Sequence, residues 1–383
     1  MKILMVHNRY QHAGGEDTVF ANEAQMLREA GHEVVEHLTS NDRIKSTFDK
    51  LLASAGVIWS YSGYRSLGHA LDIAKPDVVH VHNFFPYPSA SLFWASARRG
   101  IPTVWTLHNF RVMCANGLLY RDNQPCTKCV TGNALPAVLH KCYRGSRAGS
   151  AAVAAQIAAH RFLGTWKSKV TRFVALTEFA REQFVKAGLP AERIVVKPNF
   201  TKVNSLTFQS RMGALYVGRL SAEKGLETLV RAWAKVGEKL TIVGDGPLRG
   251  HLQQLAGPNV HFLGTMNSAE VASEMSRARL LVIPSVWFEN FPMTVIEGMA
   301  TATPILASNI GSLATLISDG VTGLHFNPGD EDDLARVANI ALADDERLRE
   351  IGRRAREHFI THLSSDKNRA ILEQIYKDVM AEN

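Results

Sequence analysis

The sequence predicts an α/β protein made of two doubly wound, parallel-sheet units with a cleft between them. The chain has 383 residues, which is long for one domain and comfortable for two. Short apolar runs alternate with helical patterns, as is typical of parallel sheets, and this alternation starts again after about Lys202. In such sheets ligands bind at the carboxyl ends of the strands, so functional residues are expected there.

Composition and charge limit the class of protein. Hydrophobic residues make up 46% and charged residues 21%, which is ordinary for a soluble enzyme. The opening residues do not form a secretory signal and no apolar stretch is long enough to span a bilayer, so we expect a cytoplasmic protein. The net charge is +7, and residues 1–200 hold 24 Lys and Arg against 14 Asp and Glu. This imbalance predicts an anionic partner for the first unit.

The first unit is expected to begin with a strand over 2–6, a glycine turn at Gly14 and Gly15, and a helix that buries Phe20, Ala24 and Leu27. Glycine lets a backbone approach a ligand closely, although a plain tight turn explains the pair equally well. Further strands are expected over 78–81, 103–107, 173–176 and 194–196.

Residues 109–150 carry few strand signals and are expected to form an insertion that contains all four cysteines. Two of them form a C-x-x-C pair and the other two flank it, in the order Cys114, Cys126, Cys129 and Cys142. Such a set can hold a structural zinc ion, while buried thiols and a disulfide pair are the alternatives. A cytoplasmic setting argues against the disulfide.

The second unit is expected to follow a linker over 199–207, with strands over 214–217, 240–243, 260–263, 280–283, 304–307 and 323–326. A final helical stretch over about 330–380 has a break near Thr361. Its acidic start, 331–333, is typical of a helix N-terminus. No Asp-x-Asp motif ends a strand, so the sequence predicts no divalent metal for catalysis.

The stretch 283–300 organises the second unit. It reads as a strand end, an aromatic loop, and a helix with Pro292 at its first position. Glu289 then lies in the loop and Glu297 about one turn inside the helix, with free amides over 291–294 between them. A helix N-terminus binds anions and a carboxylate accepts bonds from paired hydroxyls, so this pattern favours a phosphate joined to polyols. Two solvated carboxylates are the alternative.

Two cations follow the strand at 214–217. Arg219 and Lys224 lie in the loop 218–225, where a strand end would direct them to bound phosphate. An exposed basic turn is the alternative. The later loop 244–250 has the spacing G-x-G-x-x-x-G and therefore departs from the dinucleotide-binding fingerprint.

Residues 289–297 resemble the E-x7-E signature of retaining family-4 glycosyltransferases, which have the GT-B fold. Nearly the whole chain follows the family's order of motifs: Gly14 and Gly15, His108, Asn199, Gly218 to Gly225, Gly244 to Pro247, Met266, and Glu289 to Glu297. The resemblance implies two Rossmann-like lobes, with the acceptor side over 1–200 and the donor-binding lobe over 207–360. It also implies a C-terminal helix over about 361–383 that packs back on the first lobe.

The resemblance further implies a hexosyltransferase that moves a sugar, with retention, from a UDP or GDP donor to a saccharide, in bacterial surface polysaccharide synthesis. Arg219, Lys224, Glu289 and His108 are the implied catalytic residues, with His108 at the sugar. The donor-binding positions are Gly14, Gly15, Asn199, Gly218, Gly244, Met266, Asn290, Phe291, Pro292, Met293, Thr294 and Glu297, the last at the ribose. No cofactor is implied. A nucleotide-sugar 2-epimerase and a non-catalytic sugar-nucleotide binding protein are the alternatives.

A basic run from Arg98 to Arg172, with Asp122 as its only acidic residue, predicts contact with an anionic membrane and a lipid-linked saccharide acceptor. Phe162, Leu163 and Trp166 recur at helical spacing and are expected to face the lipid at the inner membrane face. Packing of these three on the protein core is the alternative. Nucleic acid is not expected, because no aromatic and basic residues interleave on a strand.

Overall fold

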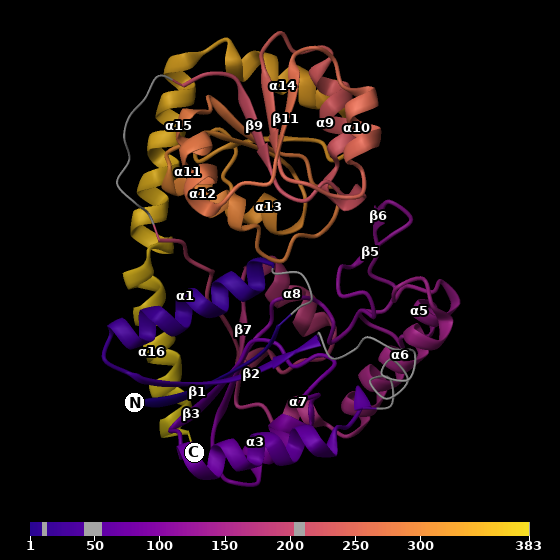
Figure 1. The fold of residues 1–383 in the computed structure, drawn as a ribbon, viewed down its shortest axis with the longest axis vertical. Coiled ribbons are helices and arrows are strands. Elements are labelled where there is room, and N and C mark those ends of the chain that lie inside the picture. Colours follow the sequence, from indigo (N-terminus) through magenta and orange to yellow (C-terminus); the bar gives the residue numbers. More distant parts are fainter. Residues whose placement is uncertain (10–13, 42–55, 203–210, 383) are drawn as a thin grey trace. The chain divides into compact units, whose positions relative to one another are not determined.

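The computed structural model describes residues 1–9, 14–41, 56–202 and 211–382. Within them the chain forms two compact units (Figure 1). The first comprises residues 1–119, 127–199 and 368–383, and the second comprises 120–126 and 200–367. Each contains one six-stranded parallel sheet, which confirms the predicted fold class. The predicted linker lies partly in 203–210, outside the described residues.

The sheet of the first unit has the order β2-β1-β3-β4-β7-β8. Its central strands are buried on both faces because helices cover both. The strands are β1 Lys2–Arg9, β2 Glu33–Ser40, β3 Val78–Val81, β4 Thr103–Thr106, β7 Arg172–Ala175 and β8 Ile194–Val196. The helices are α1 Gly15–Glu29, α3 Tyr61–Ala74, α4 Ser91–Ala97, α5 Leu135–Leu139, α6 Arg147–Phe162, α7 Thr165–Ser168, α8 Glu178–Lys186, the 3₁₀ turn Ala191–Arg193, and α16 Ser365–Ala381.

The sheet of the second unit has the order β11-β10-β9-β12-β13-β14. Its strands are β9 Ala214–Val217, β10 Leu240–Val243, β11 Val260–Gly264, β12 Leu280–Ile283, β13 Ile305–Ser308 and β14 Leu324–Phe326. Its helices are the 3₁₀ turn Ala222–Lys224, α9 Leu226–Trp233, α10 Arg249–Leu255, α11 Ser268–Arg277, α12 Met293–Ala300, α13 Gly311–Leu316, α14 Glu331–Leu342 and α15 Asp345–His358. A short antiparallel hairpin, β5 Tyr120–Arg121 and β6 Gln124–Pro125, arises from the predicted insertion.

The sequence explains where several of these elements begin. Thr177 accepts a hydrogen bond from the backbone N–H of Ala180 at the start of α8, and Asp330 caps α14 in the same way. Pro292 was expected at the first helical position of α12. It is instead the N-cap, because its ψ of 110° is extended, and the helix begins at Met293.

The chain returns to the first unit at its end. A π-helical turn, Phe359–Leu363, separates α15 from α16. Residues 368–383 then group with the first unit. Tyr376 on α16 is fully buried and contacts His80 of β3, while Asn368 contacts Lys197 after β8. The last helix is therefore part of the first unit's core.

Candidate functional site

The predicted donor-site residues of the second unit gather at one edge of its sheet. β9 pairs with β10 on one side and with β12 on the other. After β9 the chain adds strands toward one edge of the sheet, through β10 and β11, and from β12 onward it adds them toward the opposite edge. Arg219 and Lys224 follow β9, and Glu289 follows β12. This is the position at which doubly wound sheets bind ligands.

Glycines allow the loops at this edge to touch one another. Gly244 has a φ of +136°, and a Cβ there would lie 1.9 Å from the carbonyl oxygen of Gly218. Gly225 has a φ of +69°, and a Cβ there would lie 1.9 Å from the carbonyl oxygen of Pro284. Both positions therefore require glycine for space and for backbone conformation. The close approach at Gly225 places the loop that carries Lys224 against the end of β12.

An ion pair joins these two loops. Lys224 Nζ lies 2.5 Å from Glu289 Oε1, and Ser285 Oγ donates to the same oxygen at 2.7 Å. The Glu289 side chain is almost entirely buried, whereas Lys224 is about one quarter exposed. Backbone support comes from Val286 N–H, which donates to the carbonyl oxygen of Glu223 at 3.0 Å. A buried carboxylate with a cation and a hydroxyl on one oxygen keeps its second oxygen for another donor.

The start of α12 adjoins this pair. Met293 and Thr294 occupy the first turn of the helix, where backbone N–H groups have no partner within the helix. Glu297 lies one turn further on and is half-buried. Burial raises the pKa of Glu297 above its ordinary value. The preceding residues are held in place, since Phe291 is buried and Ser312 Oγ donates to the carbonyl oxygen of Asn290 at 3.1 Å.

Arg219 is the exposed cation of the site. Its backbone carbonyl accepts a hydrogen bond from Tyr216 Oη at 3.0 Å, while its side chain is solvent-exposed. Burial, with smaller effects of Glu289 and Glu223, raises the pKa of Tyr216 well above its ordinary value, so this hydroxyl remains a donor. Gly264 ends β11, and Met266 follows it at the same edge of the sheet.

The predicted residues of the first unit lie at the corresponding edge of its own sheet. Gly14 precedes α1, His108 follows β4, and Asn199 follows β8. Gly14 N–H donates to Asp17 Oδ2 at 2.9 Å, and the other oxygen of Asp17 lies 2.9 Å from His7 Nε2. Residues 10–13, which lead into the glycine turn, lie outside the described residues.

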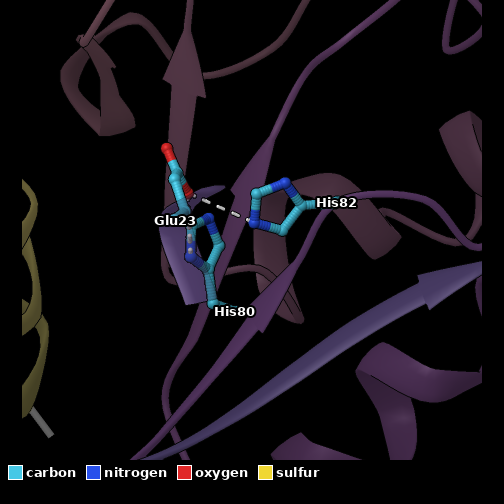
Figure 2. A group of neighbouring side chains, drawn as sticks. All are labelled: Glu23, His80 and His82. Atoms are coloured by element: carbon cyan, nitrogen blue, oxygen red, sulfur yellow. Dashed lines mark ion pairs between the residues drawn. The ribbon is translucent and has the colours of Figure 1, made fainter. Parts of the chain in front are cut away.

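A buried polar cluster beside His108 was not predicted from the sequence. Figure 2 shows Glu23 of α1 beside His80 and His82, which alternate along β3 and its end. Glu23 also binds Lys197, and all four side chains are buried. The available signals were an H-x-H pair in a buried strand and a carboxylate among the apolar positions of α1.

The structure does not support the predicted four-cysteine zinc site. None of the four described cysteines forms a disulfide bond, and Cys114 Sγ donates to Asn116 Oδ1 at 2.9 Å. Of the residues that the structure describes, only Glu23, His80 and His82 form a group of three or more potential ligands with their atoms within 4.8 Å of one another. The four cysteines are absent from such groups, and the zinc site stays a prediction.

The predicted membrane-facing residues divide into two groups. Phe162 is 91% exposed and Leu163 is 47% exposed, as expected. Trp166 was expected on the same surface, but it is 4% exposed and packs against Trp105 with ring centroids 5.1 Å apart. The break between α6 and α7 at Gly164 turns Trp166 inward and interrupts the helical spacing. Within the described residues, every helix is too short or too polar to cross a bilayer.

Comparison with known proteins covers most of the chain. A family model described as "Glycosyl transferase 4-like domain" matches residues 14–199, and one described as "Glycosyl transferases group 1" matches residues 202–358. The alpha-D-kanosaminyltransferase of Streptomyces kanamyceticus is 31% identical over 208 residues, which is 48% of this chain and 53% of that protein. The first curated relatives are matched over only 29–53% of their own lengths.

Two solved structures have the same fold over the whole chain. The sucrose-phosphate synthase of Thermosynechococcus elongatus has a TM-score of 0.72 at 17% identity and covers 100% of both chains. The Anabaena HepE protein in complex with UDP has a TM-score of 0.69 at 17% identity and covers 98% of this chain and 100% of its own. These similarities identify a GT-B fold.

Proposed function

The chain belongs to the GT-B glycosyltransferases, because a glycosyl transferase 4-like domain is followed by a group 1 glycosyl transferase domain. We propose that it transfers a sugar from a nucleotide-diphosphate donor to a saccharide acceptor. The observation that carries this proposal is the Lys224–Glu289 pair, which adjoins the N-terminus of α12 at the reversal point of the second sheet. Relatives and structural neighbours named for sugar transfer and for UDP complexes support it.

The proposed roles follow from charge and burial. The exposed guanidinium of Arg219 and the first-turn amides of α12 offer positive charge to a diphosphate. Lys224 is already paired, so it stabilises negative charge that develops on the leaving diphosphate while it holds Glu289 in place. The second carboxylate oxygen of Glu289 then accepts a hydrogen bond from a hydroxyl of the transferred sugar, and Glu297 accepts hydrogen bonds from the ribose hydroxyls.

We propose retention of the anomeric configuration and no requirement for a divalent metal. The leaving diphosphate would accept the proton of the acceptor hydroxyl on the same face, with Arg219 and Lys224 taking the neutralising role that a metal has elsewhere. In the acidic group 330–333, Asp330 caps α14 by accepting from the backbone N–H groups of Asp332 and Asp333, while Glu331 and Asp332 pair with Lys235. EDTA should leave turnover unchanged; loss of turnover that magnesium or manganese restores would contradict metal independence.

A surface of the first unit supports contact with an anionic membrane and a lipid-linked saccharide acceptor, of the kind used in surface polysaccharide synthesis. Helices α5 and α6 are neighbours, and Arg161 at the end of α6 donates to the carbonyl oxygen of Gly132 just before α5. Their exposed apolar side chains are Leu135, Leu139, Phe162 and Leu163. Exposed cations nearby in the chain are Lys128, Lys141, Arg144 and Arg147. Apolar side chains with a basic surround fit an anionic lipid surface.

The decisive experiment incubates the protein with a panel of nucleotide sugars and measures nucleotide release with and without a saccharide acceptor. Acceptor-dependent release together with a glycosylated product supports transfer, and NMR of the anomeric proton reports retention or inversion. Acceptor-independent release with a rearranged sugar would indicate an epimerase. Tight donor binding without release would indicate a binding protein.

A further inference from the structure

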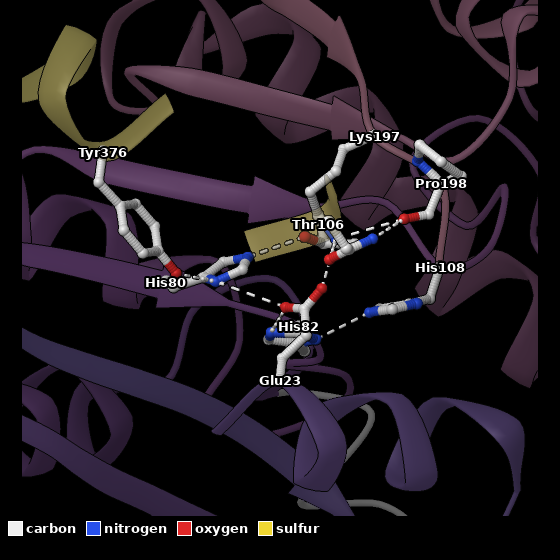
Figure 3. Close-up of polar contacts among 9 residues, drawn as sticks. Glu23, His80, His82, Thr106, His108, Lys197, Pro198 and Tyr376 are labelled. Carbon is white, nitrogen blue, oxygen red and sulfur yellow. Dashed lines mark hydrogen bonds and ion pairs between the residues drawn. The ribbon is translucent and has the colours of Figure 1, made fainter. Parts of the chain in front are cut away.

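Four side chains, of which Lys197, Glu23 and His82 are buried, form a continuous chain of polar contacts that ends at His108 (Figure 3). Lys197 Nζ lies 2.5 Å from Glu23 Oε1. The second oxygen, Oε2, lies 3.3 Å from His82 Nε2, and His82 Nδ1 lies 2.9 Å from His108 Nε2. The three residues behind His108 are fully or almost fully buried. Each comes from a different element of the first unit, so the tertiary fold alone brings them together.

Within this chain of contacts, Glu23 has its counter-ion in Lys197. Burial by itself would raise the pKa of Glu23, but Lys197, with His82 and His80, holds it well below its ordinary value. Glu23 is therefore a carboxylate and Lys197 its counter-ion. The two opposite charges therefore compensate each other inside the buried group.

The contacts of His82 favour one tautomer of its imidazole. A carboxylate oxygen 3.3 Å from Nε2 favours the His82 tautomer that carries its hydrogen on that nitrogen, which leaves the lone pair on Nδ1. His108 Nε2 must then donate its hydrogen to that lone pair. Burial first, and then His82, lowers the pKa of His108 well below its ordinary value, so His108 is neutral. Its Nδ1 is consequently a hydrogen-bond acceptor.

We propose that Glu23 and His82 are positioning residues that hold His108 in the Nε2–H tautomer. In that tautomer, Nδ1 of His108 accepts a hydrogen bond from a hydroxyl of the transferred sugar. This inference rests on the proposed function, because only a sugar-transferring enzyme would bind that sugar here. His82 and His108 both line a pocket of the first unit, together with Asn109, Arg111 and Gln156. The chain of contacts from Glu23 to His108 therefore ends beside a small pocket whose wall combines these polar side chains with apolar ones such as Phe84 and Trp105.

A metal ion is the competing explanation, because ligand atoms of Glu23, His80 and His82 all lie within 4.8 Å of one another. Three contacts weigh against it. Lys197 already supplies the cation at Glu23. Both nitrogens of His80 are engaged, Nδ1 with Tyr376 Oη at 2.7 Å and Nε2 with Thr106 Oγ1 at 2.8 Å. Metal analysis of the purified full chain provides the check. One bound metal ion per chain that is lost when these residues are substituted would overturn the proposal.

The first test is the tautomer of His108 in the full chain, measured by long-range ¹H–¹⁵N NMR on protein labelled at histidine. The His108 signals are assigned from their loss in His108→Gln. We expect the Nε2–H form in the wild type and a changed tautomer distribution in Glu23→Gln, because an amide can donate to His82 Nε2. Tyr376→Phe is the matched control: it removes a hydroxyl from the same cluster, at His80, and should leave the His108 tautomer unchanged. A wild-type Nδ1–H form, or no change in Glu23→Gln, would overturn the proposal.

The second test is kinetic and uses an active donor and acceptor pair. Partners that orient metal-bound histidines from outside typically affect activity by about 10- to 100-fold. We expect a fall of that order in kcat for Glu23→Gln and His82→Asn, with KM for the donor changed much less, and no such fall for Tyr376→Phe. If His108→Ala keeps full activity, the proposed contact between His108 and the sugar is wrong, even if the NMR spectra show the expected tautomer. A wild type without any sugar transfer would instead refute the proposed function and leave the NMR result standing.

Discussion

Lys224 Nζ lies 2.5 Å from Glu289 Oε1, and this pair joins the loops that follow two adjacent strands of the second sheet. The sequence predicted both residues in the site but did not predict the contact between them. Because Glu289 is almost fully buried, removal of Lys224 would leave a buried carboxylate without its counter-ion. The two residues are therefore expected to act as a unit.

A double-mutant cycle tests that coupling. Lys224→Ala and Glu289→Ala should each lower kcat at saturating donor, and the double variant should lose much less than the product of the single effects. Neighbouring residues in one network typically couple by about 0.5–3 kcal/mol, whereas independent sites add to within about 0.3–0.5 kcal/mol. Strictly multiplicative losses in kcat would show that the pair does not act together in the reaction.

Arg219→Ala should reduce kcat by about 100- to 1000-fold, with a smaller effect on donor affinity, since charge on the diphosphate develops as the glycosidic bond breaks. Arg231→Ala is the matched control, because Arg231 is an exposed arginine on α9 of the same unit. Single-turnover rates at saturating donor give the comparison. An unchanged rate constant for Arg219→Ala would exclude this side chain from transition-state stabilisation.

Glu297→Ala should weaken binding of UDP or GDP, whichever the wild type binds. Each hydrogen bond to a charged acceptor contributes about 1.5–3 kcal/mol, so the loss of one corresponds to about a 10- to 100-fold rise in Kd. Titration calorimetry measures it, with Glu274→Ala on α11 as the control. Equal affinity of Glu297→Ala and wild type would contradict the ribose assignment.

The same carboxylate predicts a pH dependence of nucleotide binding. Burial raises the pKa of Glu297, and the protonated acid loses acceptor capacity, so affinity should fall as pH decreases through this raised pKa. The fall should begin at a higher pH than for an ordinary glutamate. Comparison with Glu297→Gln on the same nucleotide cancels protonation of the phosphate itself, and parallel pH curves for the two proteins would count against the assignment.

Local patterns predicted the fold because a doubly wound sheet repeats one short unit. Apolar runs of four or five residues separated by helical spacing identified most strands of both sheets to within a residue or two, but β1 and β2 each extend further toward their carboxyl ends than the apolar residues indicated. The hairpin at Tyr120–Pro125 was missed because its strands have two residues each and lack apolar alternation. Pro292 was placed one residue too far into α12, since proline fixes φ but leaves ψ free.

The site was predictable where its residues follow one another in the chain. The loop 218–225 and the stretch 289–297 each carry their chemistry within one segment, whereas Glu23, His82 and Lys197 meet only through tertiary packing. A histidine in a buried strand gives the same sequence signal whether it orients a neighbour or satisfies local hydrogen bonds. Spacing likewise could not separate Phe162 from Trp166, because the turn at Gly164 sets which one faces solvent.

Membrane contact is tested by flotation of the full chain with lipid vesicles. We expect recovery with anionic vesicles at low salt, little with neutral vesicles, and loss at high salt, because each cation near an anionic leaflet contributes about 1 kcal/mol and is screened by ions. Phe162→Ser should weaken binding, whereas Ile340→Ser, an exposed apolar position of the second unit, should not. Equal recovery with neutral and anionic vesicles would favour a soluble acceptor.

The buried histidines of the first unit predict that the protein is less stable in acid. Burial lowers the pKa of both His80 and His108 well below the ordinary value of 6.5, so between that value and the lowered ones the unfolded chain binds protons that the native protein does not. Stability must then rise with pH through this window, by up to about 1.4 kcal/mol per pH unit for each histidine. Glu23 acts in the same direction at lower pH, because its depressed pKa makes the native state favour the ionised form.

The measurement is the thermal unfolding midpoint between about pH 7.5 and about pH 5.5 at constant ionic strength. The midpoint should fall as the pH is lowered. His80→Asn should be less stable at neutral pH, because it loses the contact with Tyr376, yet its midpoint should fall less steeply with acid, because one titrating group is gone. The slope separates this effect from repulsion among the excess positive charges, which both proteins share. A midpoint that is constant or rises toward acid would mean that these histidines are already charged in the native protein.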